Sequence, residues 1–132
     1  LRWYTAPGSR CSRMLFGFDH AKRFNCIVVV EGATDALTLG PQAVGCMTKH
    51  MSDKQIQILA DNNIDKRVVA VMFDGKASKE TQKNVDRLKA HGLNAFAVTY
   101  PDELLEADPN DLGWKRSWEL ITSQVPNAAP DF

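Results

Sequence analysis

Two continuous runs of apolar, mostly β-branched residues constrain the fold of this chain more than any other feature of its sequence. The runs are Cys26–Val30 and Val68–Phe73. Runs without polar alternation are typical of strands buried on both faces, which occur in parallel sheets covered by helices. Segments with helical spacing separate the two runs. We therefore predict an α/β fold built from strand–helix–strand units.

The rest of the pattern supplies the helices and two further strands. Ser52 and Gln55 form a capping box that opens one helix, and His91-Gly92 closes another. The expected helices are Ala33–Leu39, the helix after Ser52, a helix whose apolar residues from Ala77 to Leu88 recur at helical spacing, and a last helix from about Leu112 to Ser123. The added strands are Ala43-Val44 and Asn94–Thr99. This order predicts a Rossmann-like, mainly parallel four-stranded sheet flanked by helices.

Length and composition fit one folded domain. The chain has 132 residues, of which 44% are hydrophobic, so it is large enough to bury a core, and its composition excludes a disordered chain or a disulfide scaffold. It has no apolar run long enough to cross a membrane. We expect a lead-in segment at residues 1–25, an α/β domain at 26–125 and a flexible tail at 126–132. Because the sequence begins with Leu1, we expect a fragment of a longer protein.

The formal net charge of zero conceals an uneven distribution of charge, with a basic N-terminal segment and an acidic C-terminal segment. Residues 1–25 hold five basic residues against one acidic residue, whereas residues 101–132 hold two basic residues against seven acidic ones. The basic residues Arg10, Arg13, Lys22 and Arg23 are interleaved with aromatic ones, a combination that suits single-stranded nucleic acid. Lys79 would extend a basic strip. The alternative is that the aromatic residues anchor the segment to the sheet while the basic groups stay solvated.

The cysteines indicate a reducing compartment. Cys11, Cys26 and Cys46 are odd in number and widely spaced, with no CxxC pair and no Cys/His cluster. We interpret them as reduced thiols packed as small hydrophobic residues in a cytoplasmic protein.

Carboxylates follow the predicted strands at one edge of the sheet. Glu31 comes directly after one buried run and Asp74 directly after the other, while Asp35 lies one helical turn beyond Glu31. Asp108 and Asp111 lie in a loop after the last strand that can fold over the same edge. Converging carboxylates repel one another unless a cation neutralises them, and oxygen ligands suit Mg²⁺. The sequence therefore predicts a magnesium site, against the alternative that these acids cap helices or stay solvated.

Several segments, in order, resemble Toprim domains, which bacterial and phage primases share with topoisomerases and some nucleases. Primases fit best. Val30–Leu37 is similar to the glutamate motif of these domains, and Phe73–Ala77 occupies the place of their Asp-x-Asp motif. The further similar segments are Arg13–Phe18, Ala43–Thr48 with the Ser52 helix, and Tyr100–Leu112, which resembles an acidic Pro-Asp-Gly…Asp-Pro-Asp ending.

The resemblance implies a Toprim-like fold and a role in DNA replication, in a DNA primase or primase-helicase. It implies Mg²⁺- or Mn²⁺-dependent nucleotidyl transfer on a single-stranded DNA template, with nucleotides as substrates and a replicative helicase domain or partner. By the same resemblance, Glu31 is a general acid/base or metal ligand, and Asp74 is a metal ligand supported by Asp35 and Asp108.

One position departs from the family pattern. Lys76 stands where the second aspartate of Asp-x-Asp is expected, and a protonated lysine is no ligand for Mg²⁺. Its ammonium could instead neutralise Asp74 or Glu31, or contact a phosphate as a catalytic residue. Metal binding is therefore expected to be weakened, and the centre is either active with altered metal binding or a non-catalytic nucleic-acid-binding module. A Toprim nuclease or topoisomerase fragment is the other alternative.

Overall fold

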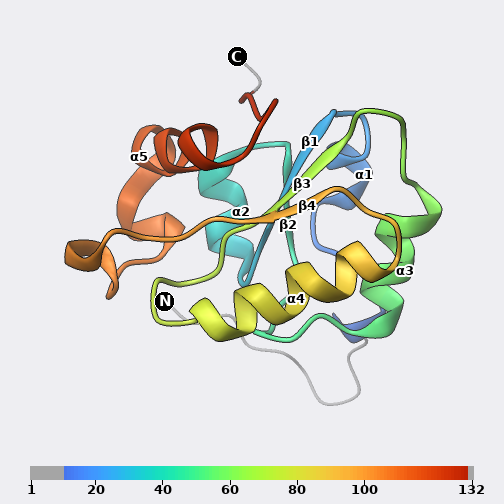
Figure 1. Cartoon of the computed structure of the whole chain (residues 1–132), viewed down its shortest axis with the longest axis horizontal. Helices are drawn as coiled ribbons and strands as arrows, with labels where there is room; N and C mark the ends of the chain where they lie inside the picture. The colour runs from blue at the N-terminus through green and yellow to red at the C-terminus, as the bar shows by residue number, and fades with distance from the viewer. Residues whose placement is uncertain (1–10, 131–132) are drawn as a thin grey trace.

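The four strands of the protein run parallel in a single sheet with the spatial order β2-β1-β3-β4. The computed structural model describes residues 11–130 (Figure 1). The strands are β1 (Cys26–Val30), β2 (Ala43–Gly45), β3 (Val68–Val71) and β4 (Ala95–Ala97). In the register, Val28 lies opposite Ala43 on one side and Ala70 on the other. The predicted α/β fold with a four-stranded parallel sheet is confirmed.

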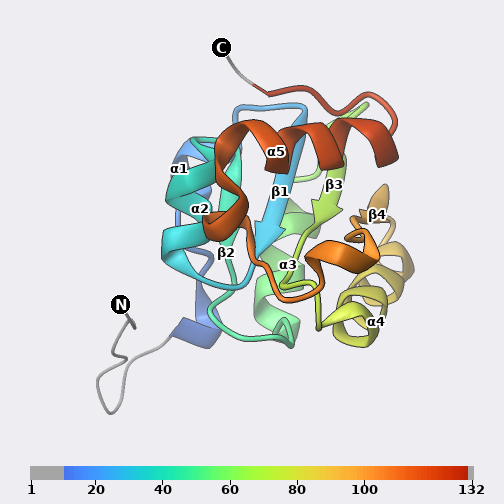
Figure 2. The same cartoon turned by 90° about the vertical axis from the view of Figure 1, so that its left-hand side faces the viewer.

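Helices cover both faces of the sheet, which makes three layers (Figure 2). The α-helices are α1 (Phe18–Ala21), α2 (Ala33–Leu39), α3 (Asp53–Asp61), α4 (Ser78–Ala90) and α5 (Pro109–Gln124), and the short 3-10 turns are η1 (Cys11–Arg13) and η2 (Asp102–Leu104). Alternate residues of β1 face opposite layers: Ile27 and Val29 join the core beneath α3 and α4, whereas Val28 and Val30 join the core beneath α2 and α5. Burial on both faces explains why the strands are apolar throughout.

The chain reverses its direction across the sheet between β1 and β3. From β1 it passes through α2 to β2 on one side, and then returns through α3 to β3 on the other side of β1. In open α/β sheets, ligands bind at such a switch point, beyond the carboxyl ends of the strands. The residues that follow β1 and β3 are therefore the first place to look for a site.

The last helix begins earlier than the sequence predicted. α5 starts at Pro109 rather than near Leu112, because Asp108 caps it and Pro109 occupies its first turn. Asp111, predicted to lie in a loop, is the third helical residue and completes a capping box with Asp108. Gly113, with φ of 82°, interrupts the helix with a backbone conformation that favours glycine. The predicted strands Val68–Phe73 and Asn94–Thr99 are also shorter in the structure, at four and three residues.

Residues before the first strand take part in the core. Leu15 is 4% exposed and Ala21 is fully buried, and Phe16 forms an antiparallel bridge with Gly45. Cys26 and Cys46 are buried free thiols, and burial raises the pKa of each to about 11. The side chain of Cys11 lies outside the described residues. Within residues 11–130, no helix is long and apolar enough to cross a membrane.

Candidate carboxylate site

Three aspartates from three different elements meet beyond the carboxyl ends of β1 and β3. One carboxylate oxygen from each of Asp35, Asp74 and Asp108 lies within 4.8 Å of the others. Asp35 belongs to the first turn of α2, Asp74 follows β3, and Asp108 is the N-cap of α5. This group joins acids that are up to 73 positions apart in the sequence. The structure brings together three of the four predicted metal ligands.

The segment between β4 and α5 carries Asp108 to the site. It runs across the ends of β1 and β3, at which the arrowheads of both strands point (Figure 2). The N–H of Gly75 donates to the carbonyl of Ala107 at 3.0 Å. A Cβ atom on Gly75 would lie 2.6 Å from the carbonyl oxygen of Leu105, so only glycine allows this close approach. Gly75 thus sets the distance between Asp74 and Asp108.

Asp35 is the most deeply buried member of the cluster. Only 6% of the residue is exposed, and its carboxylate accepts a hydrogen bond from the N–H of Asn110 at 3.1 Å. Burial, followed by the charge of Asp108, raises the pKa of Asp35 to about 6. A buried carboxylate beside other carboxylates is costly to ionise, and a divalent cation removes that cost.

Glu31 lies beside this cluster. Burial and then the charge of Asp74 raise the pKa of Glu31, whereas the charge of Lys49 lowers it. The pKa values of Asp74 and Asp108 are also raised, in both cases chiefly by burial. Glu31 is not within the compact group of three, although the charges of Asp74 and Asp108 both act on it.

Lys49 is a neighbouring cation that the sequence analysis did not single out. Its charge acts on both Glu31 and Asp74. The loop that carries it is held by the buried Asn84 of α4, whose amide donates to the carbonyl of Lys49 at 2.9 Å and accepts from the N–H of Met51 at 3.0 Å. A lysine between β2 and α3 has no signal of its own in the sequence, because only the fold places that loop beside the acids.

Lys76 forms an ion pair with Glu106. Its Nζ lies 2.6 Å from Oε2 of Glu106, and both side chains are largely exposed. Neither Glu31 nor Asp74 has Lys76 among the charges that shift its pKa. The ammonium at the second position of the predicted Asp-x-Asp motif therefore engages the acidic segment around η2.

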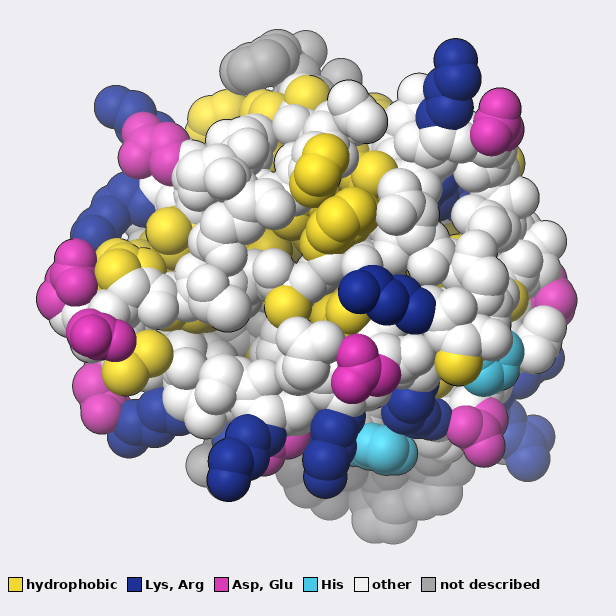
Figure 3. All heavy atoms as spheres, viewed as in Figure 1, with side chains coloured by type: hydrophobic (Ala, Val, Ile, Leu, Met, Phe, Trp, Pro, Cys, Tyr) yellow, Lys and Arg dark blue, Asp and Glu magenta, His cyan; other side chains and the backbone are white. Residues whose placement is uncertain are grey.

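The predicted nucleic-acid-binding residues lie at different places. Lys79 is exposed in the first turn of α4, near the end of the sheet that holds Asp74. Lys22 and Arg23 are exposed at the opposite end, before β1 begins. Arg13 is exposed at the end of η1, and Arg10 lies outside the described residues. In Figure 3, basic side chains gather over and below α4, and acidic ones gather at the edge formed by the segment around η2.

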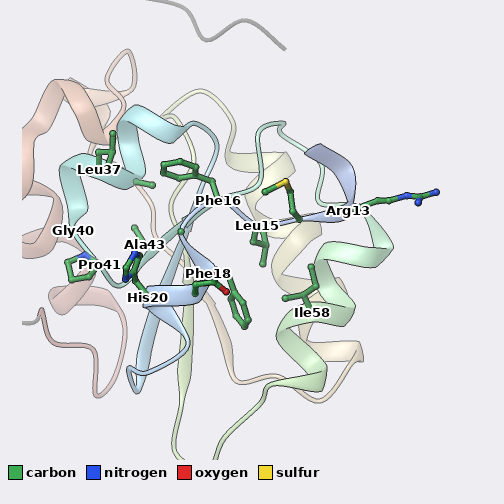
Figure 4. Close-up of a pocket in the computed structure, with 14 residues that line it drawn as sticks. Arg13, Leu15, Phe16, Phe18, His20, Leu37, Gly40, Pro41, Ala43 and Ile58 are labelled. Carbon is green, nitrogen blue, oxygen red and sulfur yellow. The ribbon is translucent and has the colours of Figure 1, made fainter. Parts of the chain in front are cut away.

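A large cavity lies away from the carboxylates. It measures about 860 Å³ and is mostly apolar, with Phe16, Leu37 and Pro41 among its lining. Figure 4 shows Phe16 and Leu37 on its wall and the side chain of Arg13 extending away from it. None of the three clustered aspartates lines it. The size of this cavity does not make it the candidate site, because the groups that can hold an ion are the three aspartates outside it.

The donor set of the cluster fits a hard divalent cation. Mg²⁺ and Mn²⁺ prefer carboxylate oxygens and keep part of their water shell, so a few protein ligands suffice. After burial, the charges of neighbouring aspartates also raise the pKa values of Asp35 and Asp74, so the ionised carboxylates repel one another. The three aspartates can therefore hold one such cation.

The sequence matches no protein-family model and no curated protein, but the fold matches solved structures. One is the crystal structure of the Aquifex aeolicus primase, with its zinc-binding and RNA polymerase domains, at a TM-score of 0.72 and 21% identity. Another is the RNA polymerase domain of Mycobacterium tuberculosis primase DnaG, at a TM-score of 0.67 and 25% identity. The matches cover 92% and 96% of this chain but 32% and 45% of those chains. This protein has a primase-like fold that spans less than half of either structure.

Proposed function

We propose that this chain is the Toprim domain of a DNA primase or primase-helicase and supports divalent-cation-dependent nucleotidyl transfer on a single-stranded DNA template. The observation that carries the proposal is the meeting of Asp35, Asp74 and Asp108 at the switch point of a primase-like sheet. The order of the sequence segments that resemble Toprim domains supports it further. The unpaired buried thiols Cys26 and Cys46 suit a reducing compartment, and we extend the proposal to a cytoplasmic location.

In this proposal the three aspartates hold the cation. A bound Mg²⁺ or Mn²⁺ supplies charge stabilisation for the phosphates and for the attacking and leaving oxygens. Glu31, whose pKa is raised by burial and by Asp74, accepts the proton of the attacking hydroxyl at a carboxylate oxygen. Lys49 and Lys79 orient the incoming phosphates or the template backbone from the two sides of Asp74. A replicative helicase domain or partner belongs to the same proposal.

A test measures cation binding and synthesis separately. The polypeptide that carries this chain is mixed with a single-stranded template, ribonucleotides and Mg²⁺, and primer products are separated by length. We expect template-directed synthesis that falls by about 100-fold or more in Asp74→Asn, whereas Asp65→Asn, which changes an exposed acid in the loop before β3, leaves it unchanged. Absence of Mn²⁺ binding at millimolar concentration would contradict the proposal.

A second candidate function is favoured by the ion pair between Lys76 and Glu106. With a lysine at the second position of the motif, the domain would bind nucleic acid or nucleotide without chemistry. It predicts that the wild-type protein binds single-stranded DNA in a salt-dependent manner and yields no primer at any Mg²⁺ or Mn²⁺ concentration. Cleavage of the template in the same assay would instead favour a Toprim nuclease.

A further inference from the structure

The hydroxyl of Tyr100 is an exception in an otherwise satisfied interior. Within residues 11–130 it is the one buried side-chain N or O atom that has no hydrogen-bond partner. Tyr100 itself is 9% exposed, and its ring belongs to the same core as Val98 and Leu112. A buried hydroxyl without a partner costs about 1–3 kcal/mol, and phenylalanine would fill the same space without that cost. The hydroxyl therefore calls for an explanation other than packing.

The hydroxyl of Tyr100 lies in the electrostatic field of the carboxylate cluster. The charges of Asp74, Asp35 and Asp108 all raise the pKa of Tyr100, after burial as the main cause. The phenol is therefore neutral and carries a proton that it can donate. Tyr100 lies in the segment between β4 and α5, the same segment that carries Asp108 to the site.

A small cavity joins Tyr100 to the cluster. It measures about 80 Å³, and its lining includes Tyr100, Asp74 and the polar side chains of Ser78, Gln82 and Thr99. One water molecule occupies about 30 Å³ of liquid, so this mostly apolar space accommodates a few water molecules beside Asp74 and Tyr100. A hydrated cation at the aspartates would have room for its water shell beside the tyrosine.

We propose that Tyr100 is a positioning residue of the carboxylate site, whose hydroxyl donates a hydrogen bond to a water molecule of the hydrated divalent cation held by Asp35, Asp74 and Asp108. This inference rests on the proposed function, because it assumes that the aspartates bind a cation. Mg²⁺ and Mn²⁺ retain several waters, and partners of such outer ligands typically change metal affinity by about 10- to 100-fold. The hydroxyl thus contributes a polar contact to the site from the segment that follows β4.

The test is Tyr100→Phe, which removes the hydroxyl and keeps the ring. Binding of Mn²⁺ is measured by the electron paramagnetic resonance signal of the free ion, and thermal unfolding is measured in EDTA. We expect the affinity for Mn²⁺ to fall by about tenfold while the midpoint of unfolding in EDTA stays the same or rises. Thr122→Val is the control, because it removes a hydroxyl whose partner is the carbonyl of Trp118 in the same helix, and it should leave the affinity unchanged.

The outcomes separate this inference from the proposed function. If the wild type binds Mn²⁺ and Tyr100→Phe binds it equally within about twofold, the role of Tyr100 is overturned and the proposed function stands. If Tyr100→Phe lowers the unfolding midpoint in EDTA, the hydroxyl has a protein partner and the inference is overturned as well. If the wild type binds no Mn²⁺ at millimolar concentration, the proposed function and the inference fail together.

Discussion

At the residue scale, the burial of Asp35 dominates the electrostatics of the site. Only 6% of the residue is exposed, and its carboxylate lies beside those of Asp74 and Asp108. The backbone N–H groups of Gly32 and Asn110 donate hydrogen bonds to it. Such a charge lowers the stability of the cation-free fold and raises the affinity for a cation. Stability and function therefore oppose each other at this one position.

Asp35→Asn separates these two effects. The neutral amide keeps an oxygen that accepts from the N–H of Asn110 but removes the buried charge. We expect the cation-free protein to gain about 1–2 kcal/mol of unfolding free energy, and the affinity for Mn²⁺ to fall by more than about tenfold. Urea unfolding in EDTA and Mn²⁺ titration measure the two quantities. A destabilised variant would show that the ionised carboxylate supports the fold.

Lys76 occupies the second position of the predicted Asp-x-Asp motif, and its ammonium pairs with Glu106. Lys76→Asp removes a positive charge, restores the second acid of the motif and leaves Glu106 unpaired. We expect the affinity for Mn²⁺ to rise by about tenfold, and Lys76→Gln, which only removes the charge, to give a smaller rise. Isothermal titration calorimetry measures both. Equal affinities in all three proteins would mean that the side chain at position 76 does not reach the cation.

At the element scale, the site depends on how closely the segment between β4 and α5 approaches the end of β3. Gly75→Ala would place a Cβ atom 2.6 Å from the carbonyl oxygen of Leu105, and that backbone must shift. We expect a loss of about 1–3 kcal/mol of unfolding free energy together with weaker Mn²⁺ binding, because Asp108 moves with the segment. Ser123→Ala, at an exposed position in the last turn of α5, is the control. Unchanged binding in Gly75→Ala would remove Asp108 from the ligand set.

A second contact between elements joins α4 to the loop that carries Lys49. Asn84 is fully buried and holds both the carbonyl of Lys49 and the N–H of Met51. Asn84→Ala leaves these groups without a partner, so we expect a loss of about 2–3 kcal/mol in urea unfolding. Lys83→Ala, on the exposed side of the same helix, should change stability by less than about 0.5 kcal/mol. Similar stabilities for the two variants would show that the loop does not depend on Asn84.

At the scale of the whole molecule, the acids make stability depend on pH and on the cation. Burial raises the pKa of Asp35 to about 6 in the fold, from an ordinary value of 3.8, so between these values the folded state binds more protons than the unfolded state. Stability without metal therefore falls as pH rises from about 4 to 6. We expect the unfolding midpoint in EDTA to be higher at pH 5 than at pH 7.5 by roughly 5 °C. Saturating Mg²⁺ should remove most of this difference, and a midpoint that rises with pH in EDTA would contradict the assignment.

The strands and most helices could be predicted because their signals are local. An uninterrupted run such as Cys26–Val30 and a capping box such as Ser52 with Gln55 depend on neighbours in the chain. The start of α5 was predicted less well, because the sequence around Asp108 is equally typical of a loop and of a helix N-cap. The structure shows it as the N-cap and as a member of the carboxylate group.

The sequence alone determined the layer architecture and the edge of the sheet at which the acids gather, because hydrophobic period and strand order are properties of the chain. Only the tertiary structure decided which acids come within ligand distance of one another, that Lys76 pairs with Glu106, and that Lys49 and Tyr100 belong to the neighbourhood of the site. These contacts join residues from separate elements, and their distances follow from the packing of loops that carry no periodic signal.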